Sequence, residues 1–172
     1  MLTELSAYRL LWRTEDDTRL FAARLAASLL TLSASNSTFI TLEGDLGAGK
    51  TTFVRYLLQA MGVTGRIKSP TYTVVESYDI VSPASPKVAR NLWHFDFYRF
   101  NDPHEWEEAG FRDIFASPGY KLAEWPEKAA AELPIADIAI LIVADADESR
   151  RVSVRAQTPA GQQLVQDLTL SK

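Results

Sequence analysis

Apolar and polar residues alternate with two different periods along the chain, and the period changes several times. Runs of β-branched and aromatic residues with period two predict strands, and apolar residues three or four positions apart predict helices. Strands and helices follow one another in turn, which favours an α/β fold. We expect strands at 8–12, 38–42, 72–80, 88–97, 120–125, 137–144 and 151–156, and helices at 15–32, 52–61, 103–109, 111–116, 126–132 and 161–168.

Polar residues, prolines and glycines mark the ends of several predicted helices. Thr14 precedes three consecutive acidic residues, which is typical of an N-cap followed by a first helical turn. Pro103 suits the first position of a later helix, and Gly110 suits its end. Gly62 ends the helix predicted at 52–61 in the same way.

Two pairs of predicted strands are joined by short turns. A turn rich in proline and serine at 82–86 connects strands 72–80 and 88–97, and an acidic turn at 145–149 connects strands 137–144 and 151–156. Short connections of this kind predict antiparallel hairpins. The remaining strands are separated by helices, so we expect a mainly parallel sheet with antiparallel hairpin additions.

The composition is that of a globular protein of one domain, spanning 1–172. Hydrophobic residues make up 47% and charged residues 23%, and the net charge is −4. An acidic balance without long blocks of like charge argues against direct electrostatic binding of DNA or of a membrane. With no cysteine, no leader-like start and no apolar run near 18 residues, the sequence predicts a cytoplasmic protein without disulfides or a thiolate metal site.

One stretch carries a specific chemical signal. Residues 44–51 read Gly-Asp-Leu-Gly-Ala-Gly-Lys-Thr and fit the phosphate-binding loop G-x-x-x-x-G-K-[ST] without a mismatch. A predicted strand precedes it and a predicted helix follows it, so the free N–H groups and the dipole of the helix would point at bound phosphates. The sequence therefore predicts the three-layer α/β fold of P-loop NTPases.

A P-loop requires a second acidic group, which holds Mg²⁺ opposite the loop hydroxyl. Three predicted strands end in a carboxylate, at Asp96, Glu124 and Asp145. We reject Asp145 because it lies in an acidic hairpin turn. The pattern leaves Asp96 and Glu124 as alternatives, and it predicts a packing role for His94 on its strand.

Four motifs occur in a defined order: Gly-Asp-Leu-Gly-Ala-Gly-Lys-Thr-Thr at 44–52, Lys-Ser-Pro-Thr-Tyr-Thr at 68–73, His-Phe-Asp-Phe-Tyr-Arg at 94–99 and Glu-Trp-Pro at 124–126. Together they resemble the bacterial TsaE (YjeE) family over roughly residues 14–156. The family comprises small P-loop ATPases required to make threonylcarbamoyladenosine in tRNA. This sequence departs from the family pattern at Phe97, where leucine is frequent, and in the variable turn at 82–91.

The resemblance implies roles for individual residues. Lys50 and the loop around it would bind the phosphates of ATP, and Thr51 and Glu124 would hold Mg²⁺. Asp96 would be needed for catalysis together with Lys50 and Glu124. Segment 68–73 resembles a switch loop whose Thr71 and Thr73 hydroxyls sense the γ-phosphate or the metal. The implied nucleotide-binding set is Asp45, Leu46, Gly47, Ala48, Gly49, Lys50, Thr51 and Thr52.

The resulting hypothesis is a Mg²⁺-dependent ATPase that hydrolyses ATP slowly alone. The resemblance implies that partners of the TsaB and TsaD types gate its turnover, and that it meets tRNA only through their complex. Two other readings share the P-loop. A small-molecule kinase would need an acceptor pocket and an arginine-rich lid, and the chain shows no arginine-rich insertion. A nucleotide-gated binding module would use ATP to set a conformation, with negligible turnover.

Overall fold

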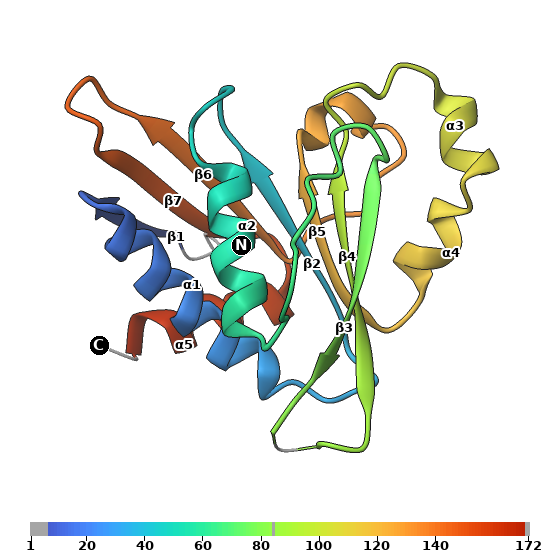
Figure 1. Ribbon diagram of the computed structural model, residues 1–172, viewed down its shortest axis with the longest axis horizontal. Helices are drawn as coiled ribbons and strands as arrows, with labels where there is room; N and C mark the ends of the chain where they lie inside the picture. The colour runs from blue at the N-terminus through green and yellow to red at the C-terminus, as the bar shows by residue number, and fades with distance from the viewer. Residues whose placement is uncertain (1–6, 84, 171–172) are drawn as a thin grey trace, which may run out of the picture.

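A computed structural model describes residues 7–83 and 85–170, in which a single twisted sheet is covered by helices on both faces (Figure 1). The start of the chain at 1–6, Ala84 in the predicted turn at 82–86, and residues 171–172 lie outside the described part. The elements in chain order are β1 Ala7–Trp12, α1 Glu15–Leu30, β2 Ser37–Glu43, α2 Lys50–Ala60, β3 Val75–Val81, β4 Ala89–Asp96, α3 Pro103–Glu108, α4 Phe111–Ala116, β5 Gly119–Glu124, the 3₁₀ helix η1 Pro126–Ala129, β6 Ile138–Ala144, β7 Arg150–Ala156 and α5 Pro159–Leu170.

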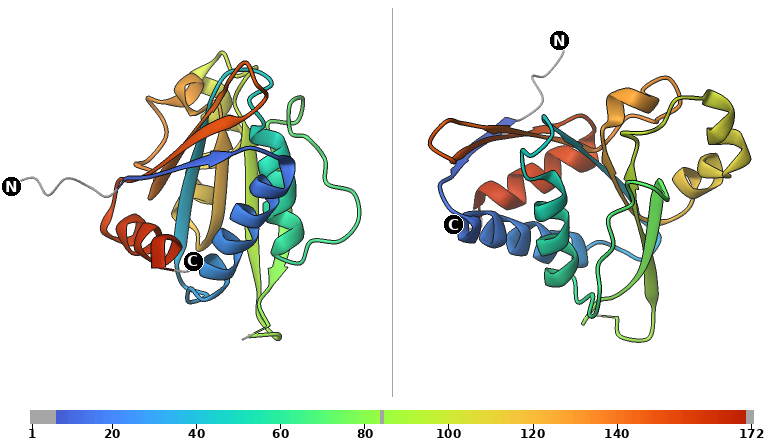
Figure 2. Two further views of the ribbon diagram at one scale, coloured as in Figure 1. Left: turned by 90° about the vertical axis from the view of Figure 1, so that its left-hand side faces the viewer. Right: turned by 45° about the horizontal axis from the view of Figure 1, so that its top comes forward.

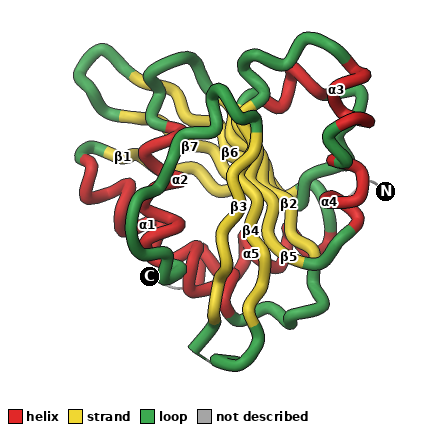
Figure 3. The backbone as a smooth tube through the Cα atoms, turned by 45° about the vertical axis from the view of Figure 1, so that its right-hand side comes forward, coloured by secondary structure: helices red, strands yellow, loops and turns green. Residues whose placement is uncertain are grey.

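The strand order is β1-β7-β6-β2-β5-β4-β3. Strands β6, β2, β5 and β4 are parallel, and they form the centre of the sheet. The hairpins β3–β4 and β6–β7 extend it with antiparallel strands on either side, and β1 adds to β7 (Figure 3). The predicted fold class is confirmed, including both hairpins. Because β2, β5 and β4 are parallel neighbours, their carboxyl ends meet at one edge of the sheet, at the top of Figure 1.

Alternation along β2 separates two apolar cores. Ile40 and Leu42 face α1, α2 and α5, whereas Phe39 faces a cluster of aromatic residues under α3, α4 and η1. Figures 1 and 2 show the same division, with α1, α2 and α5 on one face and α3 and α4 on the other. The central strand is therefore buried on both sides, which gives the P-loop that follows it a rigid base.

The start of α1 packs against the helix that follows the P-loop. Thr14 and Asp17 form a capping box, in which each side chain accepts from the other residue's backbone N–H. Trp12, Phe21 and Phe53 then stack in a triangle, with ring centroids 5.6–5.8 Å apart. These contacts fix the position of α2, and with it the direction in which its N-terminus points.

One predicted strand begins later than expected, and one predicted helix is of a different type. The strand predicted at 72–80 begins only at Val75, because a tight turn comes first: the Val74 N–H donates to the Pro70 carbonyl at 2.7 Å, and Val74 adopts a φ of 67°. Left-handed backbone is unfavourable for a β-branched residue and interrupts a strand. The helix predicted at 126–132 is a short 3₁₀ helix, since it follows a left-handed Trp125.

Helices α2 and α5 are both longer than predicted. Helix α2 begins at Lys50 rather than at residue 52, because Gly49 is its N-cap. Helix α5 spans Pro159–Leu170, and the Thr158 hydroxyl accepts from the Gly161 N–H at its first turn. In the part of the chain that is described, no helix has both the length and the apolar composition needed to cross a bilayer.

Candidate nucleotide-binding site

The loop at 44–49 requires glycine for two separate reasons. Gly44 lies so close to β6 that a Cβ atom would stand 2.4 Å from the Ile142 carbonyl oxygen. Gly49 has a φ of 106°, in the left-handed region that L side chains rarely adopt. The Ala48 N–H donates to the Asp45 carbonyl at 3.0 Å and closes the loop. This confirms the predicted order of strand, glycine loop and helix.

Helix α2 presents its N-terminus to the space above the loop. Its N-cap is Gly49, which has no side chain to accept from the first-turn N–H groups. The N–H groups of Lys50, Thr51 and Thr52 have no carbonyl partner within the helix, because they belong to its first turn. An 11-residue helix with uncapped N–H groups attracts an anion through both its donors and its dipole.

The Lys50 side chain lies under this loop. Its Nζ donates to the Gly44 carbonyl and, at 3.1 Å, to the Asp45 carbonyl, and it stands 4.1 Å from the centre of the Trp125 ring. The side chain is buried, and this desolvation lowers the pKa of Lys50, while the nearby Glu124 and Asp96 charges act in the opposite direction. A phosphate group would compete with two loop carbonyls for a cation that is already in place.

Glu124 ends β5 next to the P-loop strand, in register with Leu42 of β2. Its Oε1 accepts from the Thr51 hydroxyl at 2.9 Å, and the side chain is only 2% exposed. The sequence hypothesis required a hydroxyl and a carboxylate as a pair of oxygen ligands. Thr51 and Glu124 form such a pair at the start of α2, where they share one hydrogen bond. Of the two carboxylates that the pattern left open, Glu124 is the one that contacts Thr51.

Behind Glu124 lies His94, for which the sequence predicted packing. His94 is indeed buried, but its Nε2 lies 2.6 Å from Glu124 Oε2 in a hydrogen bond. The packing prediction therefore missed its main contact. A signal was present: residues two apart on a strand share a face, so His94 and Asp96 point to the same side of β4. Asp96 pairs with Glu124 in the β4–β5 register, so His94 and Asp96 both lie on the strand next to Glu124.

Asp96 occupies a separate position at the same edge. Its Oδ1 accepts from the Tyr98 N–H at 3.0 Å and its Oδ2 from the Thr71 hydroxyl at 3.3 Å. Burial raises the pKa of Asp96, although the bond from the Tyr98 N–H acts against this rise. A buried carboxylate with a raised pKa and few donors is suited to accept a proton.

The two threonines of segment 68–73 differ in position. Thr71 contacts Asp96 and lines the cavity above the P-loop. Thr73 is exposed, and its hydroxyl donates to Glu76 at 3.1 Å, away from the cavity lining. The structure therefore brings only Thr71 to the site.

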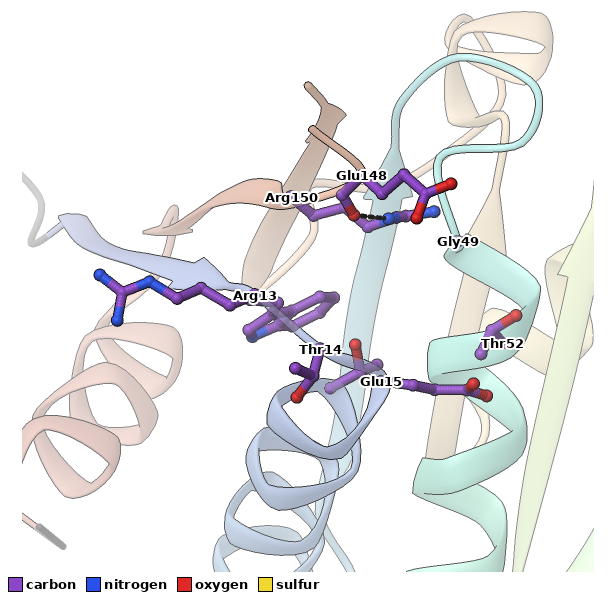
Figure 4. A pocket seen from close by; sticks show the side chains of 9 residues that line it. Arg13, Thr14, Glu15, Gly49, Thr52, Glu148 and Arg150 are labelled. Atoms are coloured by element: carbon purple, nitrogen blue, oxygen red, sulfur yellow. Dashed lines mark hydrogen bonds between the residues drawn. The ribbon is translucent and has the colours of Figure 1, made fainter. Parts of the chain in front are cut away.

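The P-loop residues, Thr71, Asp96 and Glu124 line a cavity of about 450 Å³ above the P-loop. A second cavity of about 460 Å³ adjoins it on the side of β1, α1 and the β6–β7 hairpin (Figure 4). Gly49, Thr52 and Arg150 line both cavities, so they mark the boundary between them. The first cavity is lined by Leu46, Gly47, Ala48, Gly49, Lys50, Thr51, Thr52, Thr71, Asp96, Tyr98, Arg99, Glu124, Trp125 and Arg150.

Comparison with known proteins assigns this site to a family. The family model described as "Threonylcarbamoyl adenosine biosynthesis protein TsaE" matches residues 12–152. The chain belongs to the TsaE family. The matched range contains the P-loop and every side chain described above around it. The family resemblance drawn from the four sequence motifs is thereby confirmed.

Two curated TsaE proteins and one solved structure support this assignment. The chain is 41% identical to tRNA threonylcarbamoyladenosine biosynthesis protein TsaE of Haemophilus influenzae, over 84% of this chain and 87% of the relative. It is 33% identical to the Bacillus subtilis protein of the same name, over 94% of each chain. The crystal structure of B. subtilis YdiB superposes with a TM-score of 0.76 at 26% identity, covering 98% of this chain and 97% of that one.

The donor set of this TsaE chain fits a magnesium ion that is also held by phosphates. Among the residues that the structure describes, no three His, Cys, Asp or Glu side chains come together as a complete metal site. Mg²⁺ differs from metals that need such cages, because it takes one or two carboxylates, several waters and substrate phosphates. The Thr51 hydroxyl and the Glu124 carboxylate supply oxygen ligands of this type.

The rejection of Asp145 agrees with the structure. Asp145 follows the last residue of β6, and β6 and β7 are antiparallel neighbours. Its Oδ2 forms an ion pair with Arg151 Nε at 2.9 Å. It therefore belongs to the hairpin and not to the cavity above the P-loop.

Proposed function

We propose that this protein is a Mg²⁺-dependent ATPase that acts in the biosynthesis of threonylcarbamoyladenosine in tRNA. The observation that carries the proposal is the contact between Thr51 and Glu124 at the mouth of a P-loop, within a chain of the TsaE family. The names of the two relatives support the pathway, and the Thr51–Glu124 contact supports the metal-dependent chemistry.

In this proposal the chain's own groups do most of the work by position and charge. The first-turn N–H groups of α2 and Lys50 bind the β- and γ-phosphates, as in other P-loop proteins. Thr51 and Glu124 hold Mg²⁺, which neutralises charge on the phosphates when it is bound. Asp96 orients the attacking water and accepts its proton, a role suited to its raised pKa.

The second cavity offers a place for the nucleoside. It adjoins the P-loop cavity at Gly49 and Thr52, so a nucleotide with its phosphates on the loop can extend its sugar and base into it. Thr14 and Glu15 of the lining provide polar groups that can form hydrogen bonds with a nucleoside. The choice of ATP as the nucleotide rests on two grounds: the family resemblance, and the absence of a guanine-specific N-K-x-D motif from the sequence.

We further propose that turnover is gated by partners of the TsaB and TsaD types, in one cytoplasmic complex through which the protein meets tRNA. In this scheme the single domain hydrolyses ATP to reset the complex, and a partner transfers the threonylcarbamoyl group. Arg99 lines the cavity above the P-loop, and its guanidinium lies 4.6 Å from the centre of the Tyr72 ring. Slow hydrolysis by the isolated chain is part of the same proposal.

Reconstitution tests the proposal. The purified protein is combined with TsaB- and TsaD-type partners, ATP, Mg²⁺ and tRNA, and both phosphate release and modified adenosine are measured. We expect the partners to raise phosphate release and modification to depend on this protein. A high rate of hydrolysis by the protein alone, unchanged by the partners, would contradict the gating. ATP-dependent phosphorylation of a nucleoside or sugar would instead favour a kinase.

A further inference from the structure

Arg150 reaches the P-loop from a distant part of the chain. It is the first residue of β7, immediately after the turn of the β6–β7 hairpin. Its Nε donates to the Ala48 carbonyl at 2.9 Å, and its Nη1 donates to the Glu148 carbonyl. Figure 4 shows the side chain extending from the hairpin toward Gly49, where α2 begins. The guanidinium group therefore lies beside the helix N-terminus that faces the cavity above the P-loop.

The charge of Arg150 has no carboxylate partner among the described residues. Both of its hydrogen bonds go to backbone carbonyls, and no ion pair includes it. Its neighbour Arg151 differs, because Arg151 points to the other face of the strand and pairs with Asp145. A guanidinium carries five N–H donors, so the two carbonyls leave most of them for a ligand.

The location of this free charge defines what it can bind. Arg150 lines both cavities, together with Gly49 and Thr52. If phosphates occupy the P-loop cavity and the nucleoside occupies the second one, the group at their boundary is the phosphate attached to the ribose. A planar guanidinium suits a phosphate through charge and paired hydrogen bonds.

We propose that Arg150 is a nucleotide-binding residue that contacts the ribose-linked phosphate from the β6–β7 hairpin. This inference rests on the proposed function, because it takes the ligand to be a nucleoside triphosphate. It adds a cation that no P-loop motif includes. This contact also distinguishes nucleotides from inorganic pyrophosphate. Pyrophosphate can bind to the loop and to Lys50 without reaching the boundary between the two cavities.

The experiment compares two ligands and two neighbouring arginines. Binding of ATP and of inorganic pyrophosphate, each with Mg²⁺, is measured by calorimetry for the wild type, Arg150→Gln, Arg150→Lys and the control Arg151→Gln. We expect Arg150→Gln to weaken ATP binding by about tenfold to a hundredfold and to leave pyrophosphate binding nearly unchanged. Arg150→Lys retains the charge and should lose less. Arg151→Gln should bind both ligands as the wild type does.

Two results would overturn the inference. Unchanged ATP binding by Arg150→Gln would show that the guanidinium does not contact the nucleotide. An equal loss of ATP and pyrophosphate binding would show that Arg150 only holds the loop through the Ala48 carbonyl. Thermal unfolding of each variant separates these results from loss of the fold. A wild-type protein that binds no ATP would contradict the proposed function itself, whereas the other two results leave that function standing.

Discussion

The two ends of the central sheet each bury a lysine, and they use it differently. At the carboxyl ends of the strands, Lys50 donates to two carbonyls of the P-loop beside a cavity. At the opposite end, Lys121 of β5 is fully buried and donates to the Ser37 hydroxyl at 2.7 Å and to the Ser117 carbonyl. Lys121 also lies 5.4 Å from the centre of the Trp93 ring.

The surroundings of the two lysines explain the difference. Both hydrogen-bond acceptors of Lys121, the Ser37 hydroxyl and the Ser117 carbonyl, belong to the protein itself. Around Lys50, the partners are loop carbonyls and two carboxylates that face a cavity. A buried charge alone therefore does not identify a functional site. A buried charge whose partners a ligand can replace does.

The largest expected effect separates the two lysines by function. Lys50→Ala should lower ATP hydrolysis by about 100-fold to 1000-fold, because the cation that stabilises charge on the transferred phosphate is lost. Lys121→Met should leave hydrolysis within about twofold, since Lys121 lies at the other end of the sheet. Phosphate release under saturating ATP measures both. Equal losses in the two variants would contradict the distinction.

The next effect concerns stability and pH. Desolvation lowers the pKa of Lys121 from 10.5 to about 8, against the smaller opposing effect of Asp137. Between these two pH values the unfolded chain holds a proton that the folded chain has released. The free energy of unfolding therefore gains about 3 kcal/mol from this group as pH rises through that window. Below the window, the folded protein bears the cost of the buried charge.

Lys121→Met is the matched control for this pH dependence. Urea unfolding of the wild type and the variant, measured at the two ends of the window, should show a smaller rise with pH in the variant. Titration of the remaining lysines and tyrosines is common to both proteins and cancels in the comparison. The same rise in both would show that Lys121 does not carry the effect.

A smaller effect is expected from the residue behind Glu124. His94→Leu leaves Glu124 Oε2 without its donor, so the carboxylate loses its orientation toward Thr51. We expect the Mg²⁺ concentration needed for half-maximal ATP binding to rise about tenfold, as when other residues that orient metal ligands are replaced. His94→Gln retains an N–H donor and should recover part of the loss. Titration of Mg²⁺ against ATP binding tests this, and ATP binding without Mg²⁺ should be unchanged in both variants.

The smallest effect distinguishes the two threonines of segment 68–73. Thr71→Val removes the hydroxyl that donates to Asp96, and the loss of one hydrogen bond of this kind lowers kcat by about threefold to tenfold. Thr73→Val removes a contact with Glu76 outside the cavity lining and should leave kcat unchanged. Steady-state hydrolysis of the two valine variants provides the measurement. A larger loss in Thr73→Val would place the γ-phosphate sensor elsewhere in the segment.

Local patterns predicted the elements of this fold because their causes are local. The P-loop needs glycines at fixed offsets, and both the Gly44 approach to β6 and the left-handed Gly49 follow from that requirement. Both hairpins were predicted from short turns between β-rich runs. The prediction that β3 begins at residue 72 was wrong, because Val74 takes a conformation that its residue type disfavours.

The site depends on distances across the sheet, which no local pattern contains. Choosing Glu124 over Asp96 as the partner of Thr51 needs the order β2-β5-β4 and its register. His94 required the same register, since its contact is with a residue 30 positions away. In the sequence, Arg150 is distinguished only by its adjacent partner Arg151. Its position depends on how the β6–β7 hairpin folds back toward α2, which the sequence does not state.

Trp125 gives the molecule a native optical reporter. Its left-handed backbone, with a φ of 56°, places the indole 4.1 Å from the Lys50 ammonium and 5.0 Å from the Tyr98 ring. Indole emission responds to a neighbouring charge, so movement of Lys50 toward a phosphate would change the fluorescence of this residue. Trp106, by contrast, is buried among phenylalanines under the other face of the sheet. If the proposed function holds, adding ATP should change the Trp125 emission, and stopped-flow fluorescence can measure this without a dye or a label.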